Sequence, residues 1–386
     1  MKILQVHNHY RDPGGEDSVV AAEADLLRGA GHEVFQYQVE NPVGRAAAAG
    51  ALALAPWNPA AARRLVDFAA DVRPDVAHVH NTWFSLSPSV LRGLDRAGIP
   101  VVMTLHNHRL VCANAALFRD GRPCELCVGT HPWHGVRHRC YKDSYAASAA
   151  AATTITLNRA VHTWSRHVAL FLALTRFAAE RFIAGGLPAD RIEVKPNFVA
   201  DPGRRPRPPS ASDTVLFVGR LYEPKGIGEL IDVWGAVAPA RLQLVVVGDG
   251  PLHGELERRA GPSVRLVGAL PHAAVLSLML EARALVFPSH LYEGQPMAIL
   301  EALAAGLPVL ASGHGGMAAT LQDATPGTLV AVADREAWGE ALSRLTDDVA
   351  VDFAGSTARS LYEARFTPEL ALGRLDDAYR RACGLR

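Results

Sequence analysis

Short apolar runs alternate with longer amphipathic segments along almost the whole chain, and this alternation constrains the fold more than any other feature. The runs are rich in Val, Ile and Leu, so they are typical of strands in a parallel sheet that helices cover on both faces. They occupy residues 2–7, 33–39, 75–80, 100–106, 168–174 and 191–194 in the first half, and 214–219, 241–248, 264–267, 284–287 and 308–311 in the second. The same pattern therefore occurs twice.

This repetition predicts an α/β chain with two doubly wound, Rossmann-like domains, and 386 residues suffice for two domains of ordinary size. The segment at 201–212, DPGRRPRPPSAS, has four prolines and no apolar periodicity, which is typical of a stiff, structureless linker. We expect a first domain at 1–198, a second at 199–366, and a C-terminal helix at 367–386 that packs back on the first. Ligands bind at the carboxyl ends of the strands in such sheets, so a nucleotide-type ligand in a cleft between the domains is expected.

Composition excludes several classes of protein. Apolar residues make up 49% of the chain, which suffices for globular cores and excludes a disordered chain. The 39 basic and 39 acidic residues cancel, whereas a nucleic-acid binder usually carries a basic excess. No 18 consecutive residues are apolar, and the first apolar run has the length of a strand, so we expect neither a transmembrane helix nor a signal peptide. A cytoplasmic protein is therefore expected.

The stretch PSHLYEGQPMAILEALAAGLPVLASGHGG carries two glutamates, Glu293 and Glu301, on either side of a predicted helix start. Pro296 suits the first turn of a helix, where its missing N–H costs nothing. The N–H groups of Met297 and Ala298 would then form an anion site at the helix end. A diphosphate bound there would have a carboxylate on each side to accept hydrogen bonds from hydroxyl groups. The alternative is an Ala-rich helix that carries two solvated glutamates.

A second stretch, VLFVGRLYEPKGIGELI, places two cations where a strand ends and a helix begins. Arg220 follows the strand directly, and Lys225 precedes a helix that starts near Gly226. Arginine binds phosphate oxygens with two parallel hydrogen bonds, and lysine adds a mobile point charge. The alternative is a surface Arg and Lys beside a turn, but Lys225 is one of only four lysines in the chain, which favours a function.

The first half offers a glycine turn and two histidines at strand ends. Gly14 and Gly15 follow Pro13 and open a helix, so the backbone there can approach a ligand closely. The turn lacks the GxGxxG pattern, which disfavours a dehydrogenase, and a tight turn without a ligand is the alternative. His80 and His106 end two successive strands, where a neutral imidazole can bond a hydroxyl or stabilise developing charge. With 16 histidines in the chain, an incidental position is the alternative for each.

Four of the five cysteines lie within 29 residues, at Cys112, Cys124, Cys127 and Cys140. Four thiolates with one CxxC pair suit a structural zinc site, although a second CxxC pair would be needed for a strong signature. Free thiols and disulfides are the two other interpretations, and the latter are rare in the cytosol. Three interleaved histidines offer replacement ligands: His131, His134 and His138.

The two stretches with Glu301 and Lys225, together with VVVGDGP at 245–251 and VRLVGALP at 264–271, resemble the family-4 retaining glycosyltransferases with the GT-B fold. The N-terminal YRDPGGEDSVVAAEADLLRGAGHEV and the KPNFV at 195–199 fit the same family, so the resemblance covers essentially the whole chain. It implies a nucleotide-sugar donor, a UDP-, GDP- or ADP-sugar, bound mainly by the second domain. It also implies an acceptor bound mainly by the first domain: a saccharide, a lipid-linked saccharide or a small metabolite.

The resemblance also implies roles for residues of the second domain. Arg220 and Lys225 match the pair that binds the diphosphate. Glu301 matches the residue that holds the ribose hydroxyls, and Glu293 the catalytic-site residue that contacts the donor sugar. Leu270 lies where family members contact the base through the backbone.

In the first domain, His106 matches the reaction-centre histidine and His80 an acceptor-side residue, while the turn at Gly14 and Gly15 would face the diphosphate. Many members have Gly-Phe after the first glutamate of the helix motif, whereas this chain has Gly294 and Gln295, which leaves the donor sugar open. The cysteine segment, at about 107–145, is not part of the family's motif set and resembles a subfamily insertion.

The resemblance thus implies a retaining, hexosyl-type glycosyltransferase of the EC 2.4 class. It also implies same-face attack, in which the leaving diphosphate helps to deprotonate the acceptor, so no dedicated general base is expected. No Asp-x-Asp metal clamp is assigned to the donor site, so we expect no catalytic metal. A nucleotide-sugar epimerase and a non-enzymatic nucleotide-sugar-binding protein are the alternatives. A peripheral contact with a membrane is compatible with the sequence.

Overall fold

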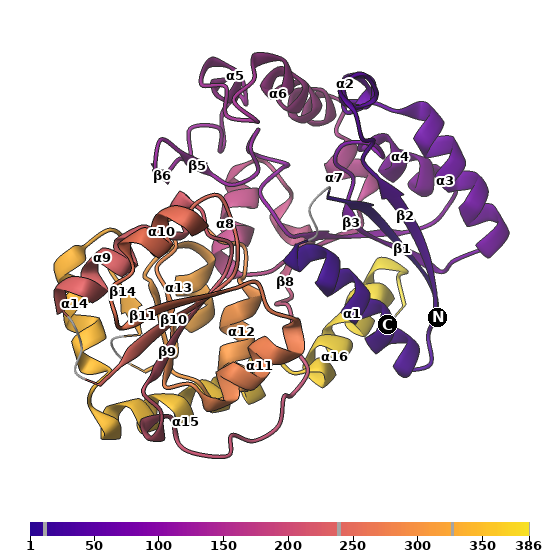
Figure 1. Ribbon diagram of the computed structural model, residues 1–386. Helices are drawn as coiled ribbons and strands as arrows, with labels where there is room; N and C mark the ends of the chain where they lie inside the picture. The colour runs from indigo at the N-terminus through magenta and orange to yellow at the C-terminus, as the bar shows by residue number, and fades with distance from the viewer. Residues whose placement is uncertain (11–13, 238–240, 326–327, 386) are drawn as a thin grey trace. The chain divides into compact units, whose positions relative to one another are not determined.

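The computed structural model describes residues 1–10, 14–237, 241–325 and 328–385. These residues form two compact units, which we call unit 1 and unit 2 (Figure 1). Unit 1 comprises Met1–Arg119, Cys124–Pro196 and the C-terminal residues from Ala371, and unit 2 comprises Asp120–Pro123 and Asn197–Leu370. The chain therefore contributes its last helix to the unit in which it begins.

Unit 1 is built on one parallel six-stranded sheet in the order β2-β1-β3-β4-β7-β8. The strands are β1 (Lys2–His9), β2 (Glu33–Glu40), β3 (Val76–Asn81), β4 (Val101–Leu105), β7 (Leu170–Ala173) and β8 (Ile192–Val194). The strand order reverses between β1 and β3, and such a switch point is where doubly wound sheets bind ligands. A register shift after Val6 places His7 of β1 beside Asn81 of β3 there.

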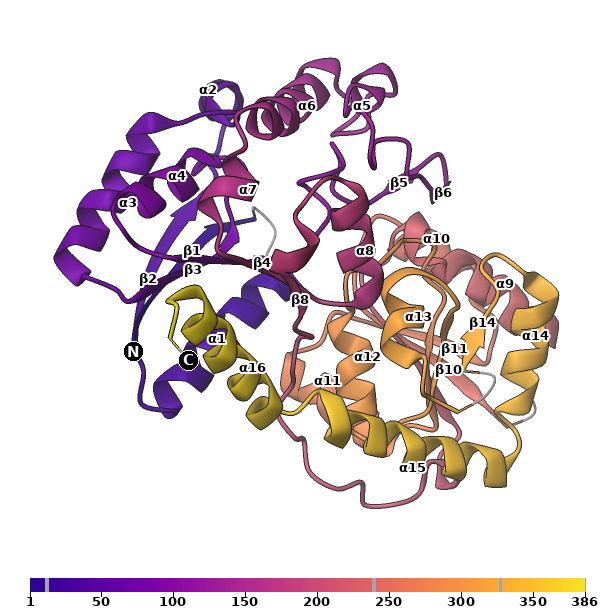
Figure 2. The ribbon, with the colours of Figure 1, turned by 180° about the vertical axis from the view of Figure 1, so that it is seen from behind.

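Helices cover both faces of this sheet (Figures 1 and 2). On one face, Leu27 of α1 and Leu375 of α16 share a core cluster with Ile3 and Val102 of the strands. The helices of unit 1 are α1 (Gly15–Gly29), α2 (Arg45–Leu54), α3 (Pro59–Val72), α4 (Ser89–Arg96), α5 (His134–Arg137), α6 (Tyr145–Ala160), α7 (Thr163–His167) and α8 (Arg176–Ala184), with α16 (Pro368–Ala382) entering it from Ala371. Two short strands, β5 (Phe118–Arg119) and β6 (Arg122–Pro123), pair with each other.

Unit 2 repeats the plan, with the strand order β11-β10-β9-β12-β13-β14. Successive residues of β9 face opposite sides: Leu216 joins one core cluster, while Val215 and Phe217 join the other. The strands are β9 (Thr214–Val218), β10 (Gln243–Val247), β11 (Val264–Gly268), β12 (Ala284–Phe287), β13 (Val309–Ser312) and β14 (Leu329–Val330). The helices are α9 (Ile227–Val237), α10 (His253–Arg259), α11 (His272–Glu281), α12 (Met297–Ala304), α13 (Gly315–Leu321), α14 (Arg335–Arg344) and α15 (Asp348–Arg365). The switch point of this sheet lies between β9 and β12.

The expectation of two doubly wound α/β units is confirmed, and each predicted strand is present with its ends within two residues of the prediction. The expectation that 201–212 is structureless is wrong. Arg205 donates hydrogen bonds to the carbonyls of Met279, Ala282 and Ala305, and the Ser210 hydroxyl donates to Asp352 at 2.7 Å. The segment packs on unit 2 because Arg205 and the short 3-10 turn at Pro209–Ala211 form hydrogen bonds there.

Candidate functional site

An ion pair joins the two loops at the switch point of unit 2. Lys225 ends the 3-10 turn Glu223–Lys225 after β9, and Glu293 lies in the loop after β12. Their Nζ and Oε1 atoms are 2.7 Å apart, and the Ser289 hydroxyl donates to the same Oε1 at 2.6 Å. Both side chains are mostly buried, with 16% and 15% exposed. Burial disfavours the charge on Lys225, but the carboxylate outweighs it and raises the lysine pKa, so the ammonium stays charged.

Two glycines allow the loops of this site to approach so closely. Gly226 has φ +70°, and a Cβ atom there would lie 2.2 Å from the carbonyl oxygen of Pro288. At Gly316, a Cβ atom would lie 2.2 Å from the Glu293 carbonyl oxygen, which accepts a 3.0 Å hydrogen bond from the Gly316 amide. Only glycine fits at these positions, so the backbone that carries Glu293 is held from both sides.

Glu301 lies in α12, which begins directly after Pro296, and it is only 9% exposed. Its Oε1 atom is 2.8 Å from Nε2 of His272, the first residue of α11. The alternative of two solvated glutamates is therefore wrong, because both carboxylates are largely buried and paired. Sequence reasoning missed His272, although the residue comes directly after the Leu270–Pro271 motif and at the start of a predicted helix.

Arg220 follows β9 and Leu270 follows β11, and β10 lies between these two strands in the sheet. Arg220 is exposed, forms no ion pair within the described part of the chain, and has its guanidinium 5.8 Å from the centre of the Tyr222 ring. Tyr222, which sequence reasoning did not single out, interacts electrostatically with Lys225, Glu293 and Arg220. Leu270 is half-buried against the core that α12 helps to form. The N–H groups of Met297 and Ala298 start α12, and their use as an anion site stays a prediction.

Gln295, which stands where many family members have phenylalanine, forms hydrogen bonds within unit 2. The side chain is buried, and its Oε1 atom accepts a 2.7 Å hydrogen bond from the Asn197 amide. Its Nε2 atom faces the Thr320 hydroxyl at 3.5 Å. The amide thus holds the start of unit 2 in place, and its replacement of an aromatic ring is explained by local structure.

A cavity at the carboxyl ends of β3 and β4 holds both predicted histidines of unit 1. Its lining includes His80, Trp83, His106 and Arg109. Nδ1 of His80 lies 3.0 Å from Nε2 of His106, and the two rings stack with centroids 5.3 Å apart. Burial lowers the pKa of His106 to about 3, so its imidazole is neutral at neutral pH. The Arg109 guanidinium lies 4.6 Å from the Trp83 ring centre, an arrangement that places a cation and an aromatic surface in one wall.

Behind this cavity, a buried set of polar side chains was not anticipated from the sequence. The Glu23 carboxylate of α1 forms an ion pair with Lys195, and neither side chain is more than 1% exposed. Its Oε2 atom lies 3.7 Å from a ring nitrogen of His78 and 3.7 Å from one of His80. His78 also contacts the Tyr379 hydroxyl at 2.8 Å. The Glu23 carboxylate therefore lies beside His80, the histidine that contacts His106.

At the start of α1, where an anion site was predicted, a side chain of the helix itself accepts a backbone hydrogen bond. Asp17 accepts a 2.9 Å hydrogen bond from the Gly14 amide and also contacts His7 and His9, at 2.9 and 2.8 Å. Burial raises the pKa of Glu16 in the same turn to about 8, so this group is mostly uncharged at neutral pH. Gly15 begins the helix, while Pro13 lies outside the described residues. Phosphate binding at Gly14 and Gly15 stays a prediction, and Asp17 would have to release the Gly14 amide.

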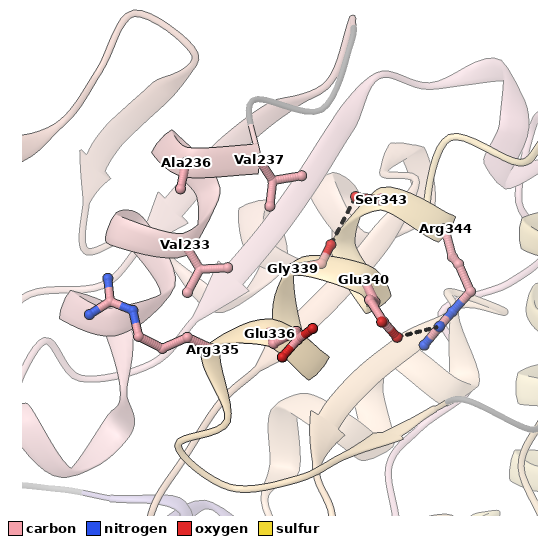
Figure 3. Close-up of a pocket in the computed structure, with 9 residues that line it drawn as sticks. All are labelled: Val233, Ala236, Val237, Arg335, Glu336, Gly339, Glu340, Ser343 and Arg344. Atoms are coloured by element: carbon pink, nitrogen blue, oxygen red, sulfur yellow. Dashed lines mark hydrogen bonds and ion pairs between the residues drawn. The ribbon is translucent and has the colours of Figure 1, made fainter.

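Two further cavities lie outside the switch points. Cys112, Cys124, Cys127 and Cys140 line one small cavity in unit 1, and no disulfide links the cysteines, all of which lie in described residues. A larger hollow lies between α9 and α14 (Figure 3), with Val233 and Val237 beside Arg335 and Glu336. It contains none of the predicted site residues.

The fold and the placement of polar residues at both switch points define a GT-B glycosyltransferase. Residues 13–201 match the family model "Glycosyltransferase Family 4", and residues 212–348 match "Glycosyl transferases group 1". The chain belongs to the family-4 glycosyltransferases. The resemblance stated from the sequence motifs is thereby confirmed.

Two relatives with known names are a glucosaminyltransferase and a mannosyltransferase. The chain is 31% identical to the 2-deoxystreptamine N-acetyl-D-glucosaminyltransferase of Streptomyces fradiae over 72% of its own length and 63% of that protein. It is 27% identical to the phosphatidyl-myo-inositol mannosyltransferase of Mycobacterium leprae, over 86% of its own length and 84% of the relative. The solved structure of Anabaena HepE in complex with UDP and glucose has the same fold, with a TM-score of 0.66, 18% identity and 98% of each chain covered.

Within the described ranges, no helix is both long enough and apolar enough to span a membrane.

Proposed function

We propose that the protein transfers a hexosyl group from a nucleoside-diphosphate donor to a hydroxyl group of an acceptor, with retention of anomeric configuration. The observation that carries the proposal is the Lys225–Glu293 pair at the switch point of unit 2, where Gly226 and Gly316 hold a charged ammonium beside a buried carboxylate. A cation and a carboxylate so placed suit a diphosphate and a sugar hydroxyl, respectively. The UDP and glucose bound in HepE support a donor of this class.

Each donor group has a proposed partner in unit 2. Arg220 is exposed and without an ion pair among the described residues, so its guanidinium can bind two phosphate oxygens, and Lys225 neutralises further charge. Glu301, which His272 orients, accepts hydrogen bonds from the ribose hydroxyls. The backbone at Leu270 binds the base. Glu293 contacts the donor sugar, with its second oxygen available because Lys225 and Ser289 share the first.

The chemistry at the acceptor is assigned to unit 1. His106 is neutral because burial lowers its pKa, so it can bond a hydroxyl group or stabilise developing charge without carrying a charge itself. His80 fixes the ring of His106 through the 3.0 Å contact, and the Glu23 carboxylate lies beside the other ring nitrogen of His80. The diphosphate is neutralised by Arg220 and Lys225, so no catalytic metal is required.

The acceptor is proposed to be a polyhydroxylated ring. The names of the two relatives contain 2-deoxystreptamine, a six-membered carbocycle, and phosphatidyl-myo-inositol, whose head group is one, and both rings carry several hydroxyl or amino groups. The cavity beside His106 is lined by polar side chains, among them Asn81 and Asn107, and such groups suit the hydroxyl groups of a ring. Soluble and lipid-linked rings share this chemistry.

The donor half of the proposal is tested by thermal denaturation with UDP, GDP and ADP and their hexose conjugates. A ligand that binds only the folded state raises the melting temperature, so one nucleoside diphosphate should stabilise the protein at saturating concentration. The transfer product is then examined by NMR, where the anomeric configuration of the new bond should match that of the donor. Absence of stabilisation by all three nucleotides, or inversion of the anomeric centre, would contradict the assignment.

A further inference from the structure

The segment between β4 and α6 is the part of unit 1 that neither the sheet nor the proposed chemistry explains. It contains two paired strands of two residues each and the four-residue helix α5, and its remaining residues form turns. Elements this short cannot bury enough apolar surface to fix their own arrangement, so such segments usually need a crosslink or a metal. The cysteines form no disulfide, which leaves the crosslinking role open.

A small cavity in this segment is lined by the side chains that zinc prefers. Six of its twelve lining residues are Cys or His, namely Cys112, Cys124, Cys127, Cys140, His134 and His138. Cys112 and Cys127 are each only 7% exposed, so the lining is shielded from solvent. The cysteines come from four separate points of the segment, and a metal that joined them would fix all of its turns at once.

The packing of α5 brings two of these points together. A Cβ atom at Gly135 would lie 2.6 Å from the Ala113 side chain and 4.0 Å from that of Cys140, so the helix lies directly against the chain next to Cys112. The Cys112 thiol donates a 2.9 Å hydrogen bond to Asn114, which shows that its sulfur faces the interior of the segment. The first and last cysteines of the set are thus neighbours of the same short helix.

The surroundings also supply positive charge. A zinc ion with four thiolates carries a net charge of about −2, which needs nearby cations in a site with little solvent. Arg119 lines the cavity, Arg159 interacts electrostatically with Cys127, and Arg109 does so with Cys112. Three guanidinium groups therefore surround the cysteines.

We propose that Cys112, Cys124, Cys127 and Cys140 bind one structural Zn²⁺ ion in tetrahedral geometry. Sulfur atoms around zinc lie about 2.3 Å from the ion and about 3.8 Å from one another. In the described residues, the only groups with three or more ligand atoms within 4.8 Å of one another are His7–His9–Asp17 and Glu23–His78–His80. Binding of zinc therefore requires a movement that brings at least three of the sulfur atoms closer together.

The two closer groups are weaker candidates for a metal. His7 and His9 already share hydrogen bonds with Asp17, which in turn caps α1. Glu23 already has the Lys195 ammonium as its cation, and a second positive ion in this buried place would repel the first. Zinc in the cysteine cavity displaces only thiol protons.

The proposal is tested on the full chain, purified without metal-affinity resin and analysed by inductively coupled plasma mass spectrometry. We expect about one zinc per chain, since four thiolates make one tetrahedral set. Cys124→Ser and Cys127→Ser should each lower the zinc content at least tenfold, whereas Cys383→Ser, which changes the cysteine outside the cluster, should leave it unchanged. Equal zinc content in all four proteins would show that the metal lies elsewhere and would overturn the site.

A measurement on the unaltered chain removes the dependence on variants that fail to fold. The protein is stripped with a chelator under reducing conditions and titrated with Co²⁺, which should give strong thiolate-to-cobalt charge-transfer absorption that saturates at one equivalent and disappears when Zn²⁺ is added. A zinc-free preparation whose Co²⁺ titration gives no charge-transfer band would refute the proposal, whatever the behaviour of the cysteine variants.

Discussion

Lys225 and Glu293 are 68 residues apart in the chain, yet their charged atoms are 2.7 Å apart in the loops after β9 and β12. These strands are neighbours in the sheet, and the strand order reverses between them. The pair therefore lies where a doubly wound sheet offers its ligand site. The same pair orders the proposed donor site before a ligand arrives, because each charge already has a partner.

Loss of either proposed phosphate ligand should weaken donor binding. We expect Arg220→Ala and Lys225→Ala each to weaken nucleoside-diphosphate binding by about 1–3 kcal/mol, the range for a charged hydrogen bond. Isothermal calorimetry measures the change, and Arg344→Ala, an exposed arginine that pairs only along α14, is the matched control. Unchanged affinity in both site variants would sink the phosphate assignment.

Glu301 and His106 should differ in the kinetic constant that they control. Glu301→Ala should raise the donor dissociation constant, because a ribose contact is the same in the ground state and the transition state. His106→Ala should mainly lower kcat, because its contact belongs to the reaction centre. Steady-state kinetics with varied donor separates the two effects, and the opposite pattern would exchange the roles.

Removing one partner of the buried Glu23–Lys195 pair should lower the free energy of unfolding more than replacing both partners with apolar residues. Lys195→Met leaves a buried carboxylate without its partner, so we expect a loss of about 3–5 kcal/mol in the free energy of unfolding. The double variant Glu23→Leu/Lys195→Met should recover most of that loss. Urea denaturation measures both, and a double variant that is less stable than Lys195→Met would show that the pair is not the reason.

The parts of the fold and of the candidate site that could be predicted are those that leave a local pattern in the sequence. Apolar runs marked the strands, and Pro296 marked the start of α12, so Glu293, Glu301 and Lys225 could be placed near strand ends. Glu23 could not be recognised, because an acidic residue in an amphipathic helix usually faces solvent. Its burial depends on Lys195, which lies 172 residues away in the chain.

The partner of Gln295 could not be foreseen either. The sequence showed only an amide where many family members have an aromatic ring, and in the structure this amide accepts a hydrogen bond from the Asn197 amide. The proline-rich segment was wrongly predicted to be structureless for a similar reason. Arg205 donates hydrogen bonds to carbonyl groups that no local sequence pattern indicates. Long-range hydrogen bonds of this kind depend on tertiary structure.

Stability should fall in mild acid because buried histidines must take up protons on unfolding. Burial lowers the pKa of His78 and of His106 from 6.5 to about 3. Between these values the unfolded chain binds more protons than the folded chain, so the stabilisation is complete above pH 6.5 and is lost as the pH falls toward 3. Urea midpoints at a series of pH values measure the slope, and His106→Asn should reduce it. An equal slope in the variant would contradict the pKa assignment.

Glu16 should act in the opposite direction at higher pH. Burial raises its pKa from 4.5 to about 8, so the folded chain holds a proton that the unfolded chain has released between these values. The contribution of this group to stability therefore decreases as the pH rises from 4.5 to 8. Glu16→Gln keeps the neutral form at all pH values and should be more stable than the unaltered chain at pH 9. A Gln variant with the same pH dependence as the unaltered chain would refute the shift.

A chelator should affect the proposed zinc site but not the proposed donor site. If Arg220 and Lys225 neutralise the diphosphate as proposed, activity should persist in EDTA, while slow removal of zinc from the proposed cysteine site should lower the melting temperature. A strict requirement for added Mg²⁺ or Mn²⁺ would contradict the metal-independent donor site.

The most direct test of the central claim is an assay that follows donor and acceptor together. UDP-, GDP- and ADP-hexoses are incubated with the protein, EDTA and a polyhydroxylated ring acceptor, and the products are separated by liquid chromatography and identified by mass spectrometry. Our account predicts that nucleoside diphosphate is released only when acceptor is present, with one hexose added to the acceptor per nucleotide released, and that Lys225→Ala lowers the rate. Donor that is bound but returned unchanged, or converted into an isomeric nucleotide sugar, would contradict it.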